Sequence, residues 1–344
     1  MTRKLTAAAI QMNAACAPTE TRLERAGRLV AEAAAAGASL VALPEIFNTG
    51  YCYSDENYQR AEPLDGETVA WMRMTAAQHG VHLAGSLLLR EGGEIFNALL
   101  LFAPDGRMWR YDKTYPWGWE RAYFRGRRGV SVAHTDLGDI GLLICWDAAH
   151  RSLWKGYAGQ VDLMLVASSP PDVTNPTFSF ENGESVTFDE FGLIGRILKD
   201  TGKYLFGEMV NQQTAWLGVP MVQTVASGHL RTVLPASRAT LLTFLPAAPS
   251  LMRHWSDARQ VTLECDFIPG CKVVDAEGRV RSALAQSDGE AVAVAEITLA
   301  DEKPRPRGAQ PKSPLPALSY LLSDGILPAL TAPVYRRGVR RLTE

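Results

Sequence analysis

The sequence predicts an α/β protein in which two mixed β-sheets pack together and helices cover the outside. Apolar segments of strand length alternate with amphipathic helical segments early in the chain, which is typical of crossover units with parallel strands. Other strand pairs are joined by short turns such as Pro104-Asp105-Gly106, which is typical of antiparallel hairpins. The composition, with 47% hydrophobic and 21% charged residues in 344, is that of a folded protein with a sizeable core.

The first segments predict a strand, a helix and a second strand. Residues 5–12 are rich in small apolar side chains, as expected for a strand covered on both faces. Residues 19–36 form an alanine-rich helix that a glycine ends. Residues 39–43 form a short buried strand, which Pro44 stops. Glu45 therefore lies at the end of a strand, where open α/β sheets bind their ligands.

The next segments predict a helix over residues 67–79 and a strand over residues 81–89. Residues 97–102 and 107–111 pair across the Pro-Asp-Gly turn, and Lys113 follows this hairpin closely.

A third group of segments leads to a cysteine. Residues 130–135 and 139–144 predict two paired strands, and Cys145 stands at the end of the second one. A helix-like run follows the cysteine, and residues 161–167 predict another buried strand. The cysteine is thus placed at a strand-to-helix turn, where backbone N–H groups favour a thiolate and can stabilise an oxyanion.

The second half of the chain has a less regular pattern. It predicts a helix over residues 186–201, a strand over 204–210, a hairpin of 272–274 with 279–284, and a last strand over 291–297. Residues 212–263 are rich in Trp and Pro and are expected to form a long insertion that acts as a lid, an interface element or both. We expect one large domain over residues 1–300 and a Pro-rich tail over 301–344 that packs on a partner subunit.

Composition also excludes several classes of function. A net charge of −2 and a pI near 6.3 give no reason to expect a nucleic-acid partner. The basic run over residues 121–128 is interpreted as a structural or anion-facing loop. The most apolar charge-free run, residues 239–252, contains two prolines and is too short to cross a membrane. Five cysteines without a Cys-x-x-Cys pair fit a reducing compartment, so we expect a cytoplasmic protein without a membrane partner.

Three polar residues that follow apolar strands form a coherent chemical set. Cys145 would be the nucleophile, and Glu45 the general base that takes its proton and later activates water. Lys113, together with the backbone N–H of Trp146, would stabilise the oxyanion. Each residue alone favours a structural interpretation, because buried cysteines and solvated charges are common. Together they predict attack on an amide-like carbon.

The segments around these residues resemble a known family. PEIFNTGY around Glu45, DKTYPWGWERAYFRGRRG around Lys113 and GLLICWD around Cys145 are similar to the three signature blocks of the nitrilase superfamily of carbon–nitrogen hydrolases. The resemblance implies a four-layer αββα sandwich, a homodimer or higher homo-oligomer, and a Glu-Lys-Cys triad that uses no cofactor and no metal. It also implies that Glu120 is a second glutamate that positions the lysine and the substrate.

Aromatic residues beside the three blocks are candidates for the walls of the substrate pocket. Tyr51, Trp117 and Trp146 are the predicted substrate-binding residues, and Trp119 lies close to them in the sequence. In the family that the chain resembles, an aspartate at the position of Asp147 is typical of amidases, whereas nitrile-cleaving members usually have a glutamate.

The sequence departs from the family where the substrate would be selected. Arg151 and Ser152 stand where related amidases usually have a Pro-Glu pair, and Lys155 lies near the position of their arginine. The expected activity is hydrolysis of a non-peptide carbon–nitrogen bond in a small carboxamide or N-carbamoyl compound, through a cysteine thioester that releases ammonia or an amine. The alternatives are hydrolysis of a nitrile and transfer of the acyl group to an amine. A catalytically inactive binding protein is disfavoured, because all four chemical groups are present.

Overall fold

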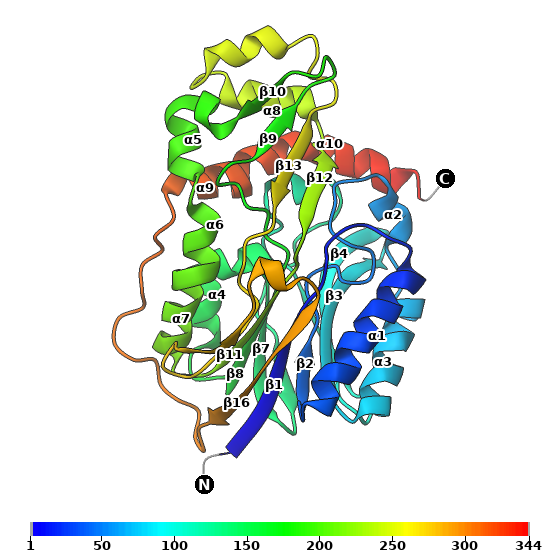
Figure 1. The fold of residues 1–344 in the computed structure, drawn as a ribbon, viewed down its shortest axis with the longest axis vertical. Helices are drawn as coiled ribbons and strands as arrows, with labels where there is room; N and C mark the ends of the chain where they lie inside the picture. Colours follow the sequence, from blue (N-terminus) through cyan, green and yellow to red (C-terminus); the bar gives the residue numbers. More distant parts are fainter. Residues whose placement is uncertain (1–2, 343–344) are drawn as a thin grey trace.

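Two six-stranded mixed sheets face each other in the structure, a computed structural model that describes residues 3–342 (Figure 1). The first has the order β16-β1-β2-β3-β4-β5, in which β2 is parallel to both neighbours and the other pairs are antiparallel. Its strands are β1 (Arg3–Gln11), β2 (Leu40–Ala42), β3 (His82–Glu91), β4 (Glu94–Phe102), β5 (Met108–Asp112) and β16 (Ala291–Leu299).

The second sheet has the order β15-β14-β11-β8-β7-β6 and the same internal pattern. Its strand β8 is parallel to β7 and β11, and the remaining pairs are antiparallel. The strands are β6 (Val132–Thr135), β7 (Gly138–Ile144), β8 (Leu163–Ser168), β11 (Met221–Val225), β14 (Lys272–Val274) and β15 (Val280–Ala283).

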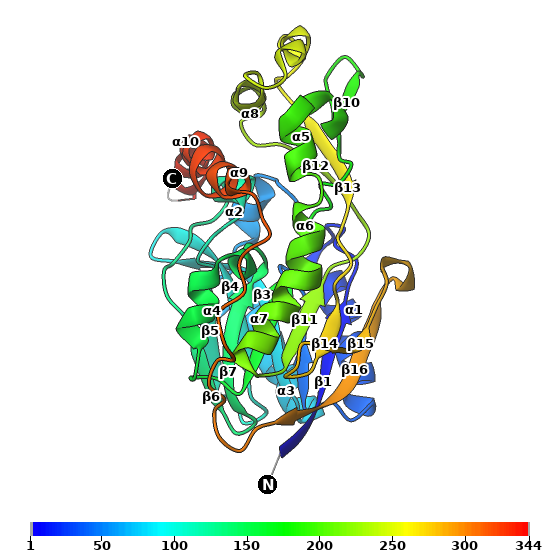
Figure 2. The same ribbon diagram turned by 90° about the vertical axis from the view of Figure 1, so that its left-hand side faces the viewer.

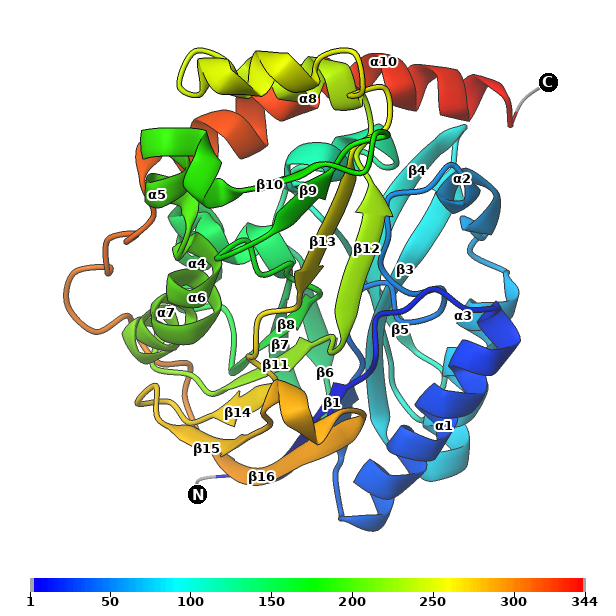
Figure 3. The ribbon, with the colours of Figure 1, turned by 45° about the horizontal axis from the view of Figure 1, so that its top comes forward.

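Helices cover the outer face of each sheet. Helices α1 (Thr19–Ala35) and α3 (Glu67–His79) lie against the first sheet, and α4 (Arg151–Tyr157) and α7 (Val210–Leu217) lie against the second (Figures 1 and 3). The strands in the middle of both sheets are buried on both faces, which explains their near-continuous apolar sequences. The predicted α/β fold with mixed sheets is thereby confirmed.

The predicted strand over residues 204–210 is wrong, because this segment is helical. Helix α6 (Thr201–Tyr204) continues through the π-helical turn η4 (Leu205–Met209) into α7. Leu205, Phe206 and Met209 are buried, and this spacing puts them on one face of a helix, whereas a strand would require alternation.

The predicted helix over residues 186–201 is only partly helical. It begins with β10 (Ser185–Thr187), continues as the short helix η3 (Phe188–Phe191), and becomes regular only in α5 (Gly192–Leu198).

The boundary of the predicted insertion also differs from the structure. Residues 212–263 include β11, which pairs with β8 and β14 inside the second sheet. The part that lies outside both sheets, called the lobe below, comprises residues 171–200 and 226–268. It contains an antiparallel sheet of order β10-β9-β13-β12, with β9 (Thr177–Ser179), β12 (His229–Val233), β13 (Thr262–Asp266), α8 (Ser237–Phe244) and η5 (Pro249–His254). Figure 2 shows the lobe extending beyond one end of the two sheets.

The tail begins irregularly and ends in a long helix. Residues 301–316 have little regular structure, and α9 (Ala317–Tyr320), η7 (Leu321–Ile326) and α10 (Leu327–Arg340) then run on as one C-terminal helix. This helix lies beside α8 in Figure 3. Residues 343–344 of the predicted tail lie outside the described part, and packing on a partner subunit stays a prediction.

The C-terminal helix is, among residues 3–342, the one segment long and apolar enough to cross a membrane by length and composition. Its side chains nevertheless make specific contacts with the body of the protein. Tyr335 Oη donates a hydrogen bond to Glu94 and accepts one from the backbone N–H of Ile95 in β4, while Leu322 and Leu327 are buried. These contacts bury one face of the helix, whereas only 28% of its most apolar stretch is buried in all. The remaining short helices are α2 (Glu56–Arg60), η1 (Gly118–Ala122), η2 (Cys145–Ala149) and η6 (Gln286–Asp288).

Candidate active site

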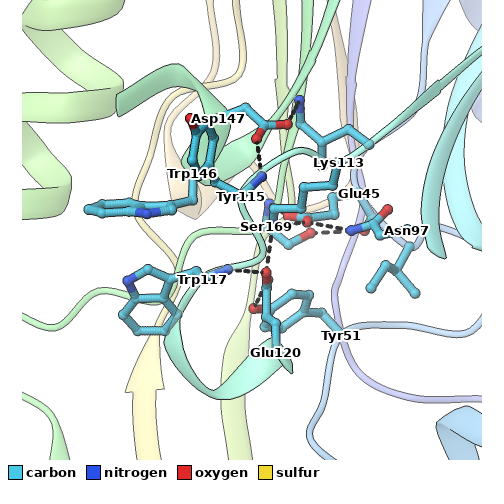
Figure 4. Close-up of polar contacts among 12 residues, drawn as sticks. Glu45, Tyr51, Asn97, Lys113, Tyr115, Trp117, Glu120, Trp146, Asp147 and Ser169 are labelled. Atoms are coloured by element: carbon cyan, nitrogen blue, oxygen red, sulfur yellow. Dashed lines mark hydrogen bonds and ion pairs between the residues drawn. The ribbon is translucent and has the colours of Figure 1, made fainter. Parts of the chain in front are cut away.

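Glu45 lies just beyond β2 and is completely enclosed by hydrogen-bond donors. Its Oε1 accepts hydrogen bonds from Asn97 Nδ2 at 2.8 Å and Lys113 Nζ at 2.7 Å. Its Oε2 accepts one from the backbone N–H of Ser169 at 2.9 Å, directly beyond β8. Figure 4 shows Asn97 and Ser169 on this carboxylate. Strands from both sheets therefore fix the carboxylate in one orientation.

Lys113 follows β5 and connects two carboxylates. Its Nζ lies 2.7 Å from Glu45 Oε1 and 2.7 Å from Glu120 Oε2, and its side chain has no exposed surface. Burial by itself would lower the pKa of Lys113, but the negative charges of Glu120 and Glu45 outweigh it and raise the pKa above its ordinary value. The lysine is therefore a permanent cation in a buried site.

Glu120 stands in η1 and holds the lysine from the other side. Its Oε2 also accepts a hydrogen bond from the backbone N–H of Trp117 at 2.7 Å. Its Oε1 accepts one from Tyr51 Oη at 2.6 Å, and both contacts are visible in Figure 4. With three donors on a buried carboxylate, Glu120 is a fixed part of the site.

Cys145 occupies a strained backbone position between β7 and η2. Its φ of 49° lies in the left-handed region, which is unfavourable for a residue with a Cβ atom. Such strain persists only where the surroundings enforce it, and it is common at sites of chemistry. The turn brings the buried thiol close enough to Glu45 for the two groups to influence each other's pKa.

The site favours a neutral thiol at rest. Burial is the main reason that the pKa of Cys145 is raised, and the charge of Glu45 raises it further, while Lys113 acts in the opposite direction. Burial also raises the pKa of Glu45 to about 7, although Lys113 opposes that shift. Glu45 can therefore accept and return a proton near neutral pH.

A cavity opens onto Cys145 and Glu120, and its walls are mostly apolar. Its empty space, counted together with the mouth that is open to solvent, is about 410 Å³. The predicted substrate-binding residues Tyr51, Trp117 and Trp146 all line it, so the structure brings all seven predicted site residues together. The other lining residues come from the lobe, α6, η4 and the chain flanking the second sheet: Pro170, Pro171, Val173, Thr201, Gly202, Leu205, Phe206 and Ile268.

Asp147 does not line this cavity, although its identity was used to favour amides. It is fully buried and accepts hydrogen bonds from the backbone N–H of Tyr115 at 2.7 Å and from Tyr111 Oη at 2.8 Å. Backbone N–H groups of Thr114 and Ile144 approach it at 3.3 Å. Asp147 thus ties the segment after Lys113 to the segment of Cys145.

Sequence reasoning missed several residues that support the site. Asn97 and Ser169 hold Glu45, and Ser86 in turn donates to Asn97 Oδ1 at 2.8 Å. Ser169 follows a buried strand, as Glu45 and Cys145 do, so the same strand-end rule could have found it. Asn97 and Ser86 are polar residues inside otherwise apolar strands. Because a buried polar group needs a hydrogen-bond partner, their position in such strands could have marked them as candidates.

The C-terminal helix also reaches the site, which no sequence pattern indicated. Asp324 Oδ1 accepts a hydrogen bond from the indole Nε1 of Trp146 at 2.9 Å, and its Oδ2 lies 3.0 Å from His150 Nε2. The ring of His150 stacks on Tyr115 with a centroid distance of 3.5 Å. The tail therefore fixes the pocket wall directly after the cysteine.

No group of three His, Cys, Asp or Glu side chains within residues 3–342 is arranged to hold a metal ion.

Comparisons with known proteins agree with this architecture. Curated relatives include a nitrilase from Pyrococcus abyssi, 29% identical over 142 residues, which covers 40% of this chain and 54% of that protein. They also include omega-amidase NIT2 from Xenopus tropicalis, 37% identical over 157 residues, with coverage of 42% and 56%. The chain therefore spans about half the length of the curated relatives it matches.

Solved structures share the fold over more of the chain. A CN-hydrolase superfamily protein from Xanthomonas campestris has a TM-score of 0.60 at 20% identity, covering 87% of this chain and 91% of that one. An amidase mutant from Nesterenkonia sp. AN1 in complex with butyramide has a TM-score of 0.60 at 17% identity, with coverage of 85% and 90%. Residues 6–181, which carry Glu45, Lys113, Glu120 and Cys145, match the carbon–nitrogen hydrolase family, and the chain belongs to that family.

Proposed function

We propose that this protein hydrolyses the carbon–nitrogen bond of a small carboxamide or N-carbamoyl compound through a thioester on Cys145. One observation carries the proposal. Glu45, Lys113 and Glu120 form a continuous buried chain of 2.7 Å contacts beside Cys145, and the cysteine and Glu120 open into the same cavity. Together they provide the base, the cation and the nucleophile that transfer of an acyl group to sulfur requires.

In the first half of the proposed reaction, Glu45 takes the proton of the Cys145 thiol as the sulfur attacks the carbonyl carbon. The new C–S bond turns the carbonyl oxygen into an oxyanion. Lys113 Nζ and the backbone N–H of Trp146 stabilise its charge. Glu45 then gives the proton to the leaving nitrogen, the C–N bond breaks, and ammonia or an amine departs from the thioester.

In the second half, water replaces the amine. Glu45 removes a proton from the water as its oxygen attacks the thioester carbon. The C–S bond breaks, the sulfur leaves as a thiol with the proton that Glu45 returns, and the acid is released. Glu120 keeps Lys113 charged and in place throughout, which is why a second buried carboxylate is useful here.

The same three groups can also hydrolyse nitriles, and curated relatives bear both the name nitrilase and the name omega-amidase. The amide assignment is supported by the related amidase, whose structure holds butyramide. Transfer of the acyl group to an amine would need only a different acceptor in the second half of the reaction.

Mass spectrometry of the intact protein during turnover tests the proposal. A panel of amides, ureido compounds and nitriles is offered, and we expect an acyl adduct on Cys145 with amides, together with release of ammonia. The Cys145→Ala variant should lose both signals. Full hydrolysis by that variant would refute the proposal, adducts formed only with nitriles would favour a nitrilase, and hydroxamate formation with added hydroxylamine in place of acid would favour acyl transfer.

We further propose that the protein is cytoplasmic and forms a homodimer or higher homo-oligomer, with the outer face of the C-terminal helix in an interface between subunits. Only 28% of the most apolar stretch of this helix is buried against the body, and this unburied apolar surface supports such a contact. Light scattering during gel filtration should give at least twice the 37.6 kDa of one chain. A monomer at micromolar concentration would contradict the assembly but leave the chemistry untouched.

A further inference from the structure

A second cavity adjoins the one at Cys145. Its empty space, counted together with the part open to solvent, is about 470 Å³, and it shares Trp117, Trp146, Val173 and Thr201 with the first cavity. Its other lining residues are Trp119, Phe188, Leu198, Phe244, Ser319, Leu322, Ser323 and Leu327. The two cavities are therefore neighbours, and the indoles of Trp117 and Trp146 lie at their boundary.

We propose that the second cavity binds the chain of the acyl group, so that the preferred substrates are amides of uncharged apolar acids with chains longer than acetyl. This inference rests on the proposed amide hydrolysis and adds the substrate class to it. The reacting carbon would lie at Cys145, and the hydrocarbon chain would pass the two tryptophans into the adjoining cavity.

The charges of the lining residues support an uncharged chain. Glu120 is the only Asp, Glu, Lys, Arg or His among the described residues that line either cavity. The nearby cation, Lys113, already contacts two carboxylates at 2.7 Å. An amide whose chain carries a carboxylate would thus bury that charge without a partner, at a high energetic cost.

The walls of the second cavity come from parts outside the two sheets. Phe188 and Phe244 belong to the lobe, and Leu322 and Leu327 belong to the C-terminal helix. All four lie beyond residues 6–181, the part that matches the family. The chain-binding end of the pocket is therefore built by residues outside the matched part, whereas Glu45, Lys113, Glu120 and Cys145 lie inside it.

The boundary between the cavities is held in place before any ligand binds. The indole of Trp146 is fixed by its hydrogen bond to Asp324 at 2.9 Å. The ring of Trp117 packs edge-on against Trp119, with centroids 5.5 Å apart and planes at 88°. Fixed aromatic walls reduce the entropy that a flexible chain and its pocket lose together on binding.

The first test measures kcat/KM for straight-chain amides from acetamide to octanamide. Burial of each CH2 group should raise kcat/KM by about fourfold until the second cavity is full. Replacing the chain end of a long amide by a carboxylate should lower kcat/KM by at least about 100-fold, because the pocket offers that carboxylate no partner.

Variants of the C-terminal helix then locate the effect. Ser323→Leu fills the second cavity and should lower kcat/KM for hexanamide and octanamide more than tenfold, with less than a twofold change for acetamide. Leu322→Ala enlarges the cavity and should favour longer chains. Leu193→Phe is the control, since Leu193 in α5 is 69% exposed and lines neither cavity.

The possible failures can be told apart. If no amide of any length reacts or forms an adduct on Cys145, the proposed function fails, and calorimetric binding of octanamide to the Cys145→Ala variant then tests the cavity by itself. If amides react but short and long chains do so equally, or Leu322→Ala does not favour longer chains, the chain-binding role is refuted. A fold defect in Ser323→Leu would lower the rates on all amides. In that case the rates of Leu322→Ala, which should rise for longer chains relative to shorter ones, still test the chain-binding role.

Discussion

The carboxylate of Glu45 is under two opposing influences. Burial away from water favours its protonated form, and the cation of Lys113 favours its charged form. The pKa settles at about 7, far above that of a carboxyl in water and close to the value that serves a general base at neutral pH. Asn97 and Ser169 matter because their hydrogen bonds fix the orientation of this carboxylate beside Cys145.

We expect kcat/KM for a neutral amide to rise with pH through about 7, because Glu45 must be deprotonated to act as the base. Initial rates from pH 5 to 9 measure this profile. Glu45→Gln should lose about 100- to 10,000-fold in kcat/KM, as expected when a general base is removed, and the remaining rate should lack the step near pH 7. A wild-type profile that stays flat from pH 5.5 to 8 would contradict the assignment of Glu45.

Lys272 shows how a buried lysine behaves without carboxylates beside it. Its Nζ donates hydrogen bonds to the carbonyl oxygens of Phe206 at 2.8 Å and Gly207 at 3.1 Å, in the π-helical turn η4. Burial lowers its pKa to about 8, whereas the pKa of Lys113 is raised. Between about 8 and 10.5 the unfolded chain binds a proton at this position that the folded protein has released, so the contribution of Lys272 to stability rises with pH there.

Lys272→Met removes this titration and the two hydrogen bonds. At pH 7 the loss of the hydrogen bonds, about 1–3 kcal/mol, is offset by removing the cost of burying the charge, so stability should change little. As the pH rises from 8 to 10.5, the wild type should gain up to about 3 kcal/mol relative to the variant, given a pKa lowered to about 8. Urea unfolding of both proteins at several pH values measures the difference. A gap that is constant over this range would show that Lys272 titrates normally in the folded protein.

Two loops of the site act as a unit because Asp147 joins them. The segment after β5 carries Lys113, and the segment after β7 carries Cys145. Both direct N–H groups at the same buried carboxylate. The aspartate therefore contributes to catalysis through the position of the two loops, and its place outside the cavity argues against its use as a marker of substrate class.

Asp147→Asn would replace one carboxylate oxygen by an amide NH2 group, so that donors would face the donors that now bind the carboxylate. We expect it to destabilise the protein by about 3 kcal/mol. The ratio of amide to nitrile turnover should stay unchanged, because Asp147 does not line the cavity. Thermal unfolding and product analysis measure the two effects. Asp105→Asn, at an exposed turn with a side chain 54% accessible, is the matched control and should change stability by less than about 0.5 kcal/mol. A changed substrate ratio in a stable Asp147→Asn protein would restore its role in specificity.

The sequence predicted the segments with strong periodicity and missed those whose structure depends on distant partners. Strands and helices up to residue 144 have apolar patterns that match one structure only, and the candidate residues at their ends were found by the strand-end rule and by resemblance. Residues 204–210 contain aromatic and branched side chains that are compatible with a strand, yet they fold as a helix because their apolar face packs on the second sheet. Strand β11 was not predicted because it has only five residues, two of them polar, Gln223 and Thr224. Its sequence therefore does not indicate that it is buried on both faces.

Contacts across long distances in the sequence were beyond such reasoning. Asp324 is 178 residues from Trp146, and nothing in either local pattern joins them. The same holds for the second cavity, whose walls combine the lobe with the C-terminal helix. Local propensity and spacing determine elements, whereas the choice of partner among elements depends on the packing of the whole chain.

The C-terminal helix contacts several parts of the molecule that are far apart in the sequence. Near its start it holds Trp146 and His150 beside the site through Asp324, and near its end Tyr335 binds β4 of the first sheet. At Gly338 it packs directly on the ring of Tyr58 in α2. Tyr58 in turn donates a hydrogen bond to the carbonyl oxygen of Ala122 in η1, the short helix of Glu120. Displacing this helix should therefore disturb the pocket as well as the fold.

Two glycines of this helix allow a matched test of that coupling. A Cβ at position 338 would collide with the aromatic ring of Tyr58, so Gly338→Ala should cost about 1–3 kcal/mol of stability and lower kcat/KM for long amides. At position 325 the nearest atom to a Cβ is Leu321 Cδ1 at 3.9 Å, so Gly325→Ala should be neutral or add up to about 1 kcal/mol. Urea unfolding and rates on short and long amides are measured for both variants. If the two variants have equal stability and equal rates, the end of the helix is loosely attached. If Gly338→Ala alone loses stability and activity on long amides, the body of the protein, the C-terminal helix and the pocket form one cooperative structure.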